Sequence, residues 1–269
     1  MSNAKRKYPN RDCLVLGIIN QKGGVGKSTT AVNLSAALGE EKFKVLLVDL
    51  DPQGNSSTGM GFDKAGCELS TYDCLLNDDV ETKEVIVDIK TKNVDLLLAT
   101  IDLAGAEAEL VQEMSRETRL REALDEVRDE YDIILIDCPP SLGLLTINAL
   151  TASDKLIIPI QCEFFALEGL AKIMDSIKLV KKRLNKNLDI FGVVITMFDK
   201  RTSLAKQVAE EVKNFFGEKL FDTKIPRTVR LSEAPGYGMP ITEYDSSCKG
   251  AKAYRKLAAE VIERYKALK

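Results

Sequence analysis

The 269-residue sequence contains no histidine, which excludes histidine from acid–base catalysis and from metal ligation. Its six cysteines are scattered without a C-x-x-C pair, a usage that fits a reduced cytosolic protein better than disulfides or a zinc site. No run reaches about 18 apolar residues and no signal peptide opens the chain, so we expect neither a membrane-spanning nor a secreted protein.

A strong excess of one charge is also lacking. The formal net charge is −3, so any nucleic-acid-binding surface must be local. With 45% hydrophobic residues the chain can build one large domain, which we expect to span residues 12–269. Residues 1–11 are polar and basic, and they predict a flexible tail.

The most informative stretch is a glycine-rich turn, KGGVGKS, from Lys22 to Ser28, which follows the apolar run Cys13–Ile19. Such a turn directs consecutive backbone N–H groups and a helix N-terminus at one point, which is a phosphate-binding geometry. Lys27 adds a full positive charge, and Ser28 offers a hydroxyl to a phosphate-bound Mg²⁺. The general phosphate-loop pattern begins with glycine, where this chain has Gln21.

Acidic residues end two further apolar runs. Asp49 and Asp51 close the run KVLLVDLD, and Asp137 closes YDIILID. Continuous apolar runs suit parallel strands that are buried on both faces, and ligands bind at the carboxyl ends of such strands. We therefore expect these carboxylates beside the phosphate loop, handling Mg²⁺ or water.

The order of the apolar runs predicts an α/β fold, namely a doubly wound, mainly parallel sheet of about seven or eight strands flanked by helices. The predicted strands are Cys13–Ile19, Lys44–Asp49, Val94–Leu98, Tyr131–Asp137, Lys155–Ile160, Ile190–Phe198 and Lys219–Ile225. Helical spacing is found over Thr71–Leu76, Thr82–Ile86, Leu103–Val127, Phe165–Leu184 and Ala251–Leu268, and Gly59–Gly66 is expected to be a loop. The apolar stripe of the last helix predicts core packing.

These motifs resemble the deviant Walker A ATPases of the ParA/MinD group, in which K-G-G-x-G-K-[ST] carries a second lysine. The segments DLDPQGN, DCPPSLG, TMFDKRT and IPRTVRLSEAPGYGMPI most resemble those of chromosomal ParA (Soj-type) partitioning ATPases, and the matching blocks span Ile18–Ile241. The resemblance implies a phosphate-loop NTPase fold of the SIMIBI type, Mg²⁺ as cofactor, and hydrolysis of ATP to ADP.

The resemblance also implies roles for individual residues. Lys22, Lys27 and Asp51 would be catalytic, with Asp51 orienting the attacking water and Lys22 reaching the partner's phosphates across a nucleotide-sandwich homodimer. Mg²⁺ would be held by Ser28, Asp51 and Asp137. The nucleotide would be bound by Gly23, Gly24, Val25, Gly26, Lys27, Ser28 and Thr29, with Met197, Pro226 and Arg227 bordering the adenine.

By the same resemblance, the ATP-bound homodimer would bind double-stranded DNA without sequence preference, and a ParB-type centromere-binding protein would stimulate hydrolysis. Arg201 and Arg230 are the candidate DNA contacts, helped by lysines of the Lys178–Lys186 run. The protein would work in the cytoplasm, on the nucleoid, without a membrane.

Other interpretations remain open on these residues. A MinD-like membrane-cycling regulator shares the loop but needs a membrane-lying C-terminal helix, and this chain places Glu260 and Glu263 there. Nitrogenase-type iron proteins and ligases such as dethiobiotin synthetase have related loops. A non-catalytic DNA-binding module would bind DNA regardless of nucleotide.

Overall fold

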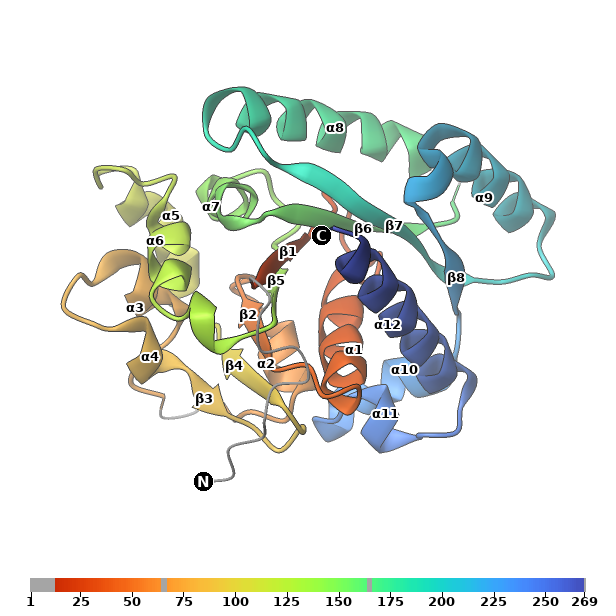
Figure 1. Ribbon diagram of the computed structural model, residues 1–269, viewed down its shortest axis with the longest axis horizontal. Helices are drawn as coiled ribbons and strands as arrows, with labels where there is room; N and C mark the ends of the chain where they lie inside the picture. The colour runs from red at the N-terminus through yellow and green to blue at the C-terminus, as the bar shows by residue number, and fades with distance from the viewer. Residues whose placement is uncertain (1–12, 64–66, 164–165, 269) are drawn as a thin grey trace.

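The computed structural model describes residues 13–63, 67–163 and 166–268. One eight-stranded sheet runs through it in the order β3-β4-β2-β5-β1-β6-β7-β8 (Figure 1). The strands pair in parallel except β3, which is antiparallel to β4. The predicted doubly wound sheet is therefore confirmed. Its strands are β1 (Leu14–Ile18), β2 (Val45–Asp49), β3 (Val87–Asp88), β4 (Val94–Leu97), β5 (Ile133–Asp137), β6 (Lys155–Gln161), β7 (Asp189–Phe198) and β8 (Leu220–Pro226).

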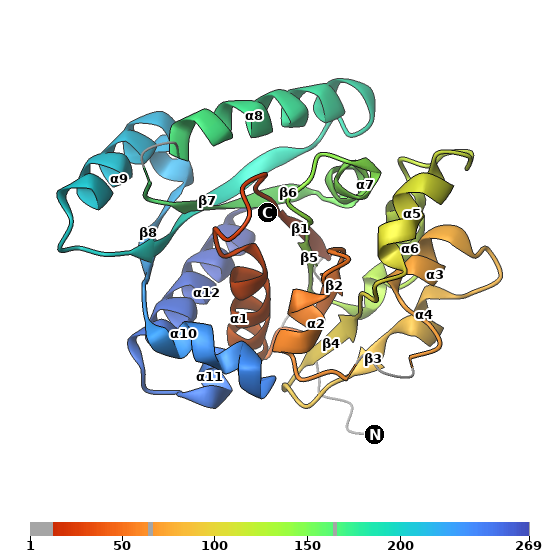
Figure 2. The same ribbon diagram turned by 180° about the vertical axis from the view of Figure 1, so that it is seen from behind.

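Helices cover both faces of the sheet, as Figures 1 and 2 show. One face is packed by α1 (Lys27–Glu40) and α12 (Lys249–Ala267). The opposite face is packed by α7 (Leu144–Ala152), α8 (Ala166–Arg183) and α9 (Ser203–Phe216). Every residue of β1, β2 and β5 is buried, which explains why these strands are continuous apolar runs. Two apolar layers therefore lie between the sheet and its helices, one on each face of the sheet.

Shorter helices line the loops around the sheet. They are α2 (Asn55–Gly59), α3 (Thr71–Leu76), α4 (Thr82–Val85), α5 (Leu103–Leu110), α6 (Arg119–Asp125), α10 (Val229–Glu233) and α11 (Ile241–Tyr244), with 3₁₀ turns at Arg128–Glu130, Gly217–Lys219 and Ala234–Tyr237.

Two expectations about secondary structure need correction. The helical pattern over Leu103–Val127 is not one helix, because α5 ends at Leu110 and α6 begins at Arg119, with Ser115 at a φ of 55° between them. The two-residue strand β3 was missed, since so short a segment has no detectable alternation. The expected N-terminal tail, part of the 59–66 loop and the start of the predicted 165–184 helix lie outside the described residues.

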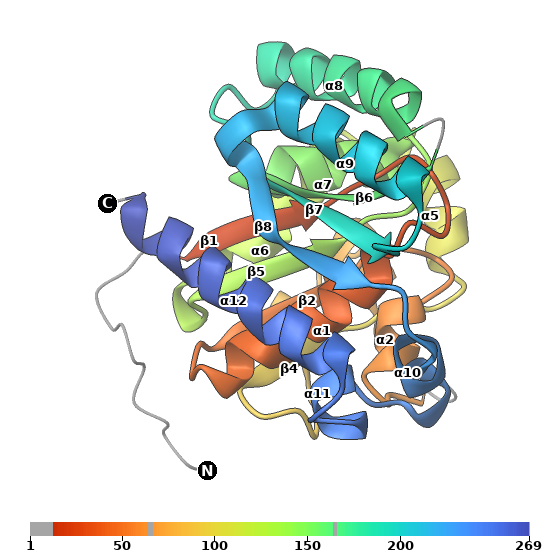
Figure 3. The same cartoon turned by 90° about the vertical axis from the view of Figure 1, so that its right-hand side faces the viewer.

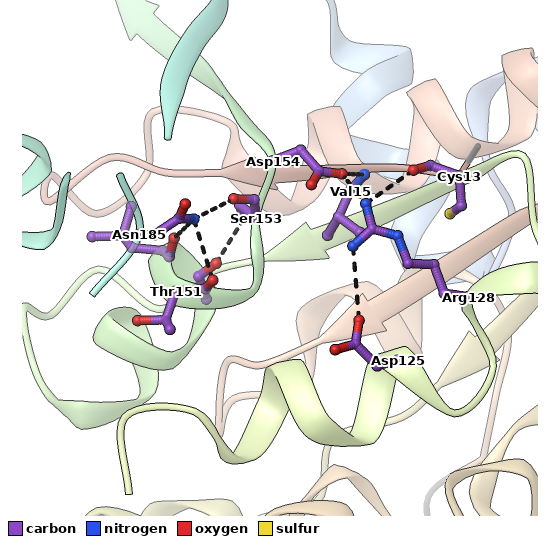
Figure 4. Close-up of polar contacts among 10 residues, drawn as sticks. Cys13, Val15, Asp125, Arg128, Thr151, Ser153, Asp154 and Asn185 are labelled. Carbon is purple, nitrogen blue, oxygen red and sulfur yellow. Dashed lines mark hydrogen bonds and ion pairs between the residues drawn. The ribbon is translucent and has the colours of Figure 1, made fainter. Parts of the chain in front are cut away.

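Polar contacts fasten the amino ends of the central strands (Figure 4). The Asp154 carboxylate accepts hydrogen bonds from the Val15 amide at 2.8 Å and from the Arg128 guanidinium at 2.5 Å. Arg128 also donates to the Cys13 carbonyl at 3.1 Å. Nearby, the Asn185 amide donates to the Ser153 carbonyl at 2.7 Å. These contacts lie at the amino ends of β1 and β6, so the carboxyl ends remain available for a ligand.

Candidate nucleotide site

A cavity of about 430 Å³ opens at the carboxyl ends of β1, β2, β5 and β7. This is the edge at which parallel α/β sheets bind ligands. Segments far apart in the sequence meet there, including the glycine-rich turn and both predicted acidic loops. The lining residues are Gly23, Gly24, Gly26, Lys27, Ser28, Thr29, Val32, Asn33, Asp51, Gln53, Asn55, Thr58, Gly59, Pro140, Met197, Ala234, Pro235 and Met239.

The glycine-rich turn has the backbone of a phosphate loop. Gly24 and Gly26 have φ angles of 74° and 89°, in a region that strongly favours glycine, and Gly26 is the N-cap of α1. Thr196 of β7 holds the turn by donating its hydroxyl to the Val25 carbonyl at 2.7 Å. The first amides of α1 therefore point into the cavity mouth, where an anion can accept from them.

Lys27 brings the cation of this site. Its side chain is buried, with 6% of the residue exposed. Burial lowers the pKa of the Lys27 amine, while the nearby carboxylate of Asp137 acts in the opposite direction. A buried ammonium of this kind lacks full hydration, and the oxygens of a phosphate group would supply the missing partners.

Asp137, at the tip of β5, provides the observation that points to a metal ion. One carboxylate oxygen, Oδ2, accepts a hydrogen bond from the Ser56 hydroxyl at 2.7 Å. The other, Oδ1, is buried and has no hydrogen-bond partner within the described chain. Burial, and then the charge of Asp49, raises the pKa of Asp137 to about 7, and the hydrogen bond from Ser56 acts in the opposite direction. An orphaned carboxylate oxygen beside a serine hydroxyl fits Mg²⁺, which takes one or two protein oxygens alongside phosphate and water.

The two aspartates after β2 have different surroundings. Asp49 is fully buried, and its Oδ2 accepts from both the amide and the hydroxyl of Ser57 at 2.7 Å. Burial raises the pKa of Asp49 to about 6. Asp51 lines the cavity and accepts from the Gln53 amide at 3.0 Å. Asp49 therefore fastens the loop, and Asp51 faces the space that a ligand would fill.

The far end of the cavity is where an adenine base would lie in the prediction. Met197 lines it with a φ of 49°, an uncommon conformation for a residue with a side chain. Pro226 and Arg227 are not among the described lining residues of this cavity, and Pro226 borders a separate groove, so their contact with adenine stays a prediction. The apolar wall comes from Ala234, Pro235 and Met239, which lie within the IPRTVRLSEAPGYGMPI motif and for which no role was predicted. Their glycine- and proline-rich context, APGYGMP, was the available signal.

The candidate DNA contacts already have partners of opposite charge. Arg201 forms a bidentate contact with Asp199, with nitrogen–oxygen distances of 2.7 and 2.9 Å. Arg230 pairs with Glu233 at 3.1 Å and with Asp245 at 3.4 Å. Both side chains are exposed, so an anion could still reach them, and their role in DNA binding stays a prediction.

Fold and site together define a phosphate-loop nucleotide-binding protein. A family model described as an AAA domain matches residues 14–190. The sporulation initiation inhibitor protein Soj of Bacillus subtilis is 55% identical over 247 residues, which are 92% of this chain and 97% of that protein. The chromosome partitioning protein ParA of Caulobacter vibrioides is 50% identical over 252 residues, covering 93% of this chain and 94% of that protein. This chain belongs to the ParA/Soj family of chromosome-partitioning ATPases.

A solved structure of similar shape is also informative. The crystal structure of a cobyrinic acid a,c-diamide synthase from Mycobacterium smegmatis, with bound ADP and magnesium, has a TM-score of 0.84 and 37% identity. The match covers 96% of this chain and 97% of the synthase chain. The predicted family and fold class are therefore confirmed.

Proposed function

We propose that this chain is a Mg²⁺-dependent ATP hydrolase that forms a homodimer on ATP and then binds double-stranded DNA without sequence preference. With a ParB-type centromere-binding partner it would partition chromosomes or plasmids, in the cytoplasm and on the nucleoid. The observation that carries the ATPase part is the orphaned Asp137 oxygen beside Lys27 and the phosphate-loop amides. The family relationship supports the partitioning part.

The residues that would hold the cofactors follow from the cavity. The phosphates of ATP or ADP would accept from the amides of residues 23–29 and from Lys27, with the base toward Met197 and Pro235. Ser28 and Asp137 would hold Mg²⁺, and Asp51 would act on it through water. Bound there, the ion neutralises charge on the β- and γ-phosphates. The magnesium and ADP in the 37% identical structure support this assignment.

Hydrolysis would then depend on positioning and electrostatics, without a histidine. Asp51 would orient a water molecule, and Lys27 would stabilise charge that develops on the γ-phosphate. Lys22 would add a second cation to the partner's phosphates, as an arginine finger does. Its backbone N–H donates to the Asn20 side chain at 3.0 Å, which fixes the start of the turn, and its side chain is about half exposed.

The MinD-like alternative, a membrane-cycling regulator, finds less support in α12. The apolar stripe of that helix is buried against α1 and the sheet, as the sequence predicted. Among the described helices, none combines the length and apolar character needed to cross a bilayer. Co-sedimentation with liposomes in the presence of ATP would restore the alternative.

The proposal is tested by measuring ATPase activity and DNA retention together, with ATP, ADP or no nucleotide, across a salt series. We expect Mg²⁺-dependent turnover and DNA retention with ATP alone, weakening steeply with salt. The Lys27→Ala variant should lose ATP affinity by roughly tenfold to a hundredfold, since a charge-assisted contact is lost. Retention that is indifferent to nucleotide would indicate a non-catalytic DNA-binding module instead.

A further inference from the structure

A second hollow lies at the edge of the sheet, between β8 and the amino-terminal half of α12. It is a groove of about 490 Å³, and lysines make up half of its lining residues. Lys224 comes from the edge strand, and Lys249, Lys252 and Lys256 come from the helix. Figure 3 shows α12 lying beside β8 at this edge. The cluster is not apparent in the sequence because its members come from two separate segments.

The charge of this groove is concentrated and available. Four lysines and one carboxylate, that of Asp222, line the groove, and the Glu260 carboxylate accepts from the amides of Asp222 and Thr223 at its margin. The groove is therefore locally basic in a chain whose net charge is −3. All four lysines are exposed. Within the described chain, Lys249, Lys252 and Lys256 form no ion pair, and the Lys224 amine lies 4.7 Å from the centre of the Phe198 ring. This differs from Arg201 and Arg230, whose charges are balanced by adjacent carboxylates.

The spacing of the lysines suits a regular polyanion. Lys249, Lys252 and Lys256 recur at three and four residues, so they share one face of α12 and extend over roughly 10 Å of its axis. One DNA strand carries a phosphate about every 3.4 Å along the duplex axis, so this row spans about three phosphates. Flexible lysines make phosphate contacts that do not read the base sequence.

The groove is also held in a fixed place relative to the phosphate loop. The Tyr254 hydroxyl on α12 lies 3.4 Å from the hydroxyl of Thr30, on the helix that begins in the phosphate loop. Tyr254 is nearly fully buried. The lysine row and the phosphate loop therefore belong to one packed unit, and a dimer formed at the nucleotide would carry two such rows at a set separation.

We propose that the groove formed by Lys224, Lys249, Lys252 and Lys256 is a phosphate-backbone contact surface for double-stranded DNA. This assignment rests on the proposed function and gives it a location. One groove supplies few contacts, and two grooves in a dimer double them, so binding becomes strong only when nucleotide joins the protomers.

The test uses the full chain and two matched double variants. Lys252→Gln/Lys256→Gln removes two charges from the groove, and Lys90→Gln/Lys92→Gln removes two exposed lysines at the opposite, β3–β4 edge of the sheet. Retention of a duplex of random sequence is measured with Mg-ATP over a salt series, and light scattering and ATP binding report on dimerisation and folding.

We expect the groove variant to dimerise and bind ATP normally and to lose at least about tenfold in DNA affinity near 100 mM salt. Because the dimer loses four charges, two from each protomer, the slope of log affinity against log salt concentration should fall in magnitude by about 3 to 4. The control variant should match the wild type in affinity and slope. A groove variant with wild-type affinity and slope would overturn this surface alone. A wild-type protein that retains no DNA with Mg-ATP would overturn the proposed function together with it.

Discussion

The ammonium group of Lys22 forms an ion pair with the carboxylate of Glu163, which follows β6 on the same chain. Both side chains are close to half exposed, so the contact is open to competition. Lys22 is the residue expected to reach the partner's phosphates in the ATP-bound dimer. A lysine held in its own protomer has to leave Glu163 before it can make that contact.

The Glu163→Gln substitution should therefore favour the dimer. It keeps the shape of the side chain and removes the charge that holds Lys22, so dimerisation should need roughly two- to fivefold less ATP, as expected from an exposed ion pair. Light scattering over an ATP titration measures this. Glu130→Gln is the matched control, because it breaks an exposed ion pair to Lys83 at 2.7 Å. A requirement for more ATP in Glu163→Gln would contradict the competition.

Replacing Lys22 itself should separate binding from turnover. Lys22→Ala leaves the phosphate-loop amides and Lys27 in place, so ATP should still bind, while hydrolysis should fall by at least about tenfold because a transition-state cation is lost. Steady-state turnover and nucleotide affinity are measured on the same preparation. Turnover equal to that of the wild type would remove the proposed role across the dimer.

The stability of the nucleotide-free protein should depend on pH through Asp137. Burial raises its pKa to about 7 in the folded chain, against an ordinary value of 3.8. Asp137 therefore contributes stability that is complete below about pH 4 and is lost as the pH rises through about 7. Denaturant unfolding in chelator, from pH 5 to 8, should show this fall on top of other titrations.

The matched variant for this effect is Asp137→Asn, which cannot ionise. Its unfolding free energy should change less over the same pH range than that of the wild type. Added Mg-ATP should stabilise the wild type most at the higher pH, where the carboxylate is charged, and should do less for the variant. Equal pH profiles for the two proteins would show that Asp137 is not the group responsible.

Arg230 offers a test of the DNA contacts expected from the family resemblance. Arg230→Glu should weaken DNA retention and leave ATP-driven dimerisation intact. The substitution also places a carboxylate beside Glu233 and Asp245, which now pair with the arginine. The neutral Arg230→Gln variant and thermal melting separate that repulsion from the loss of a phosphate contact. A monomeric Arg230→Gln protein in Mg-ATP would show that this residue serves the dimer instead.

Much of the fold could be predicted because parallel strands that are buried on both faces have continuous apolar sequences. Each of the seven expected strands is present, with ends shifted by a few residues. Local signals also placed the phosphate loop, since glycines at positive φ, a lysine and a serine occur within one short turn. The break between α5 and α6 was not predicted, because the helical spacing of apolar residues continues through Ser115, whereas the backbone leaves the helical conformation there.

Only those parts of the nucleotide site whose residues are contiguous in the sequence could be predicted. The sequence alone determined that a phosphate loop is followed by acidic strand tips, because chain order and strand direction bring those elements to one edge of the sheet. Tertiary structure alone decided that Ser56 supports Asp137, that Ala234, Pro235 and Met239 close the cavity, and that lysines of β8 and α12 share a groove. These arrangements bring together residues from 25 to about 200 positions apart, and only the packing of helices on the sheet sets such distances.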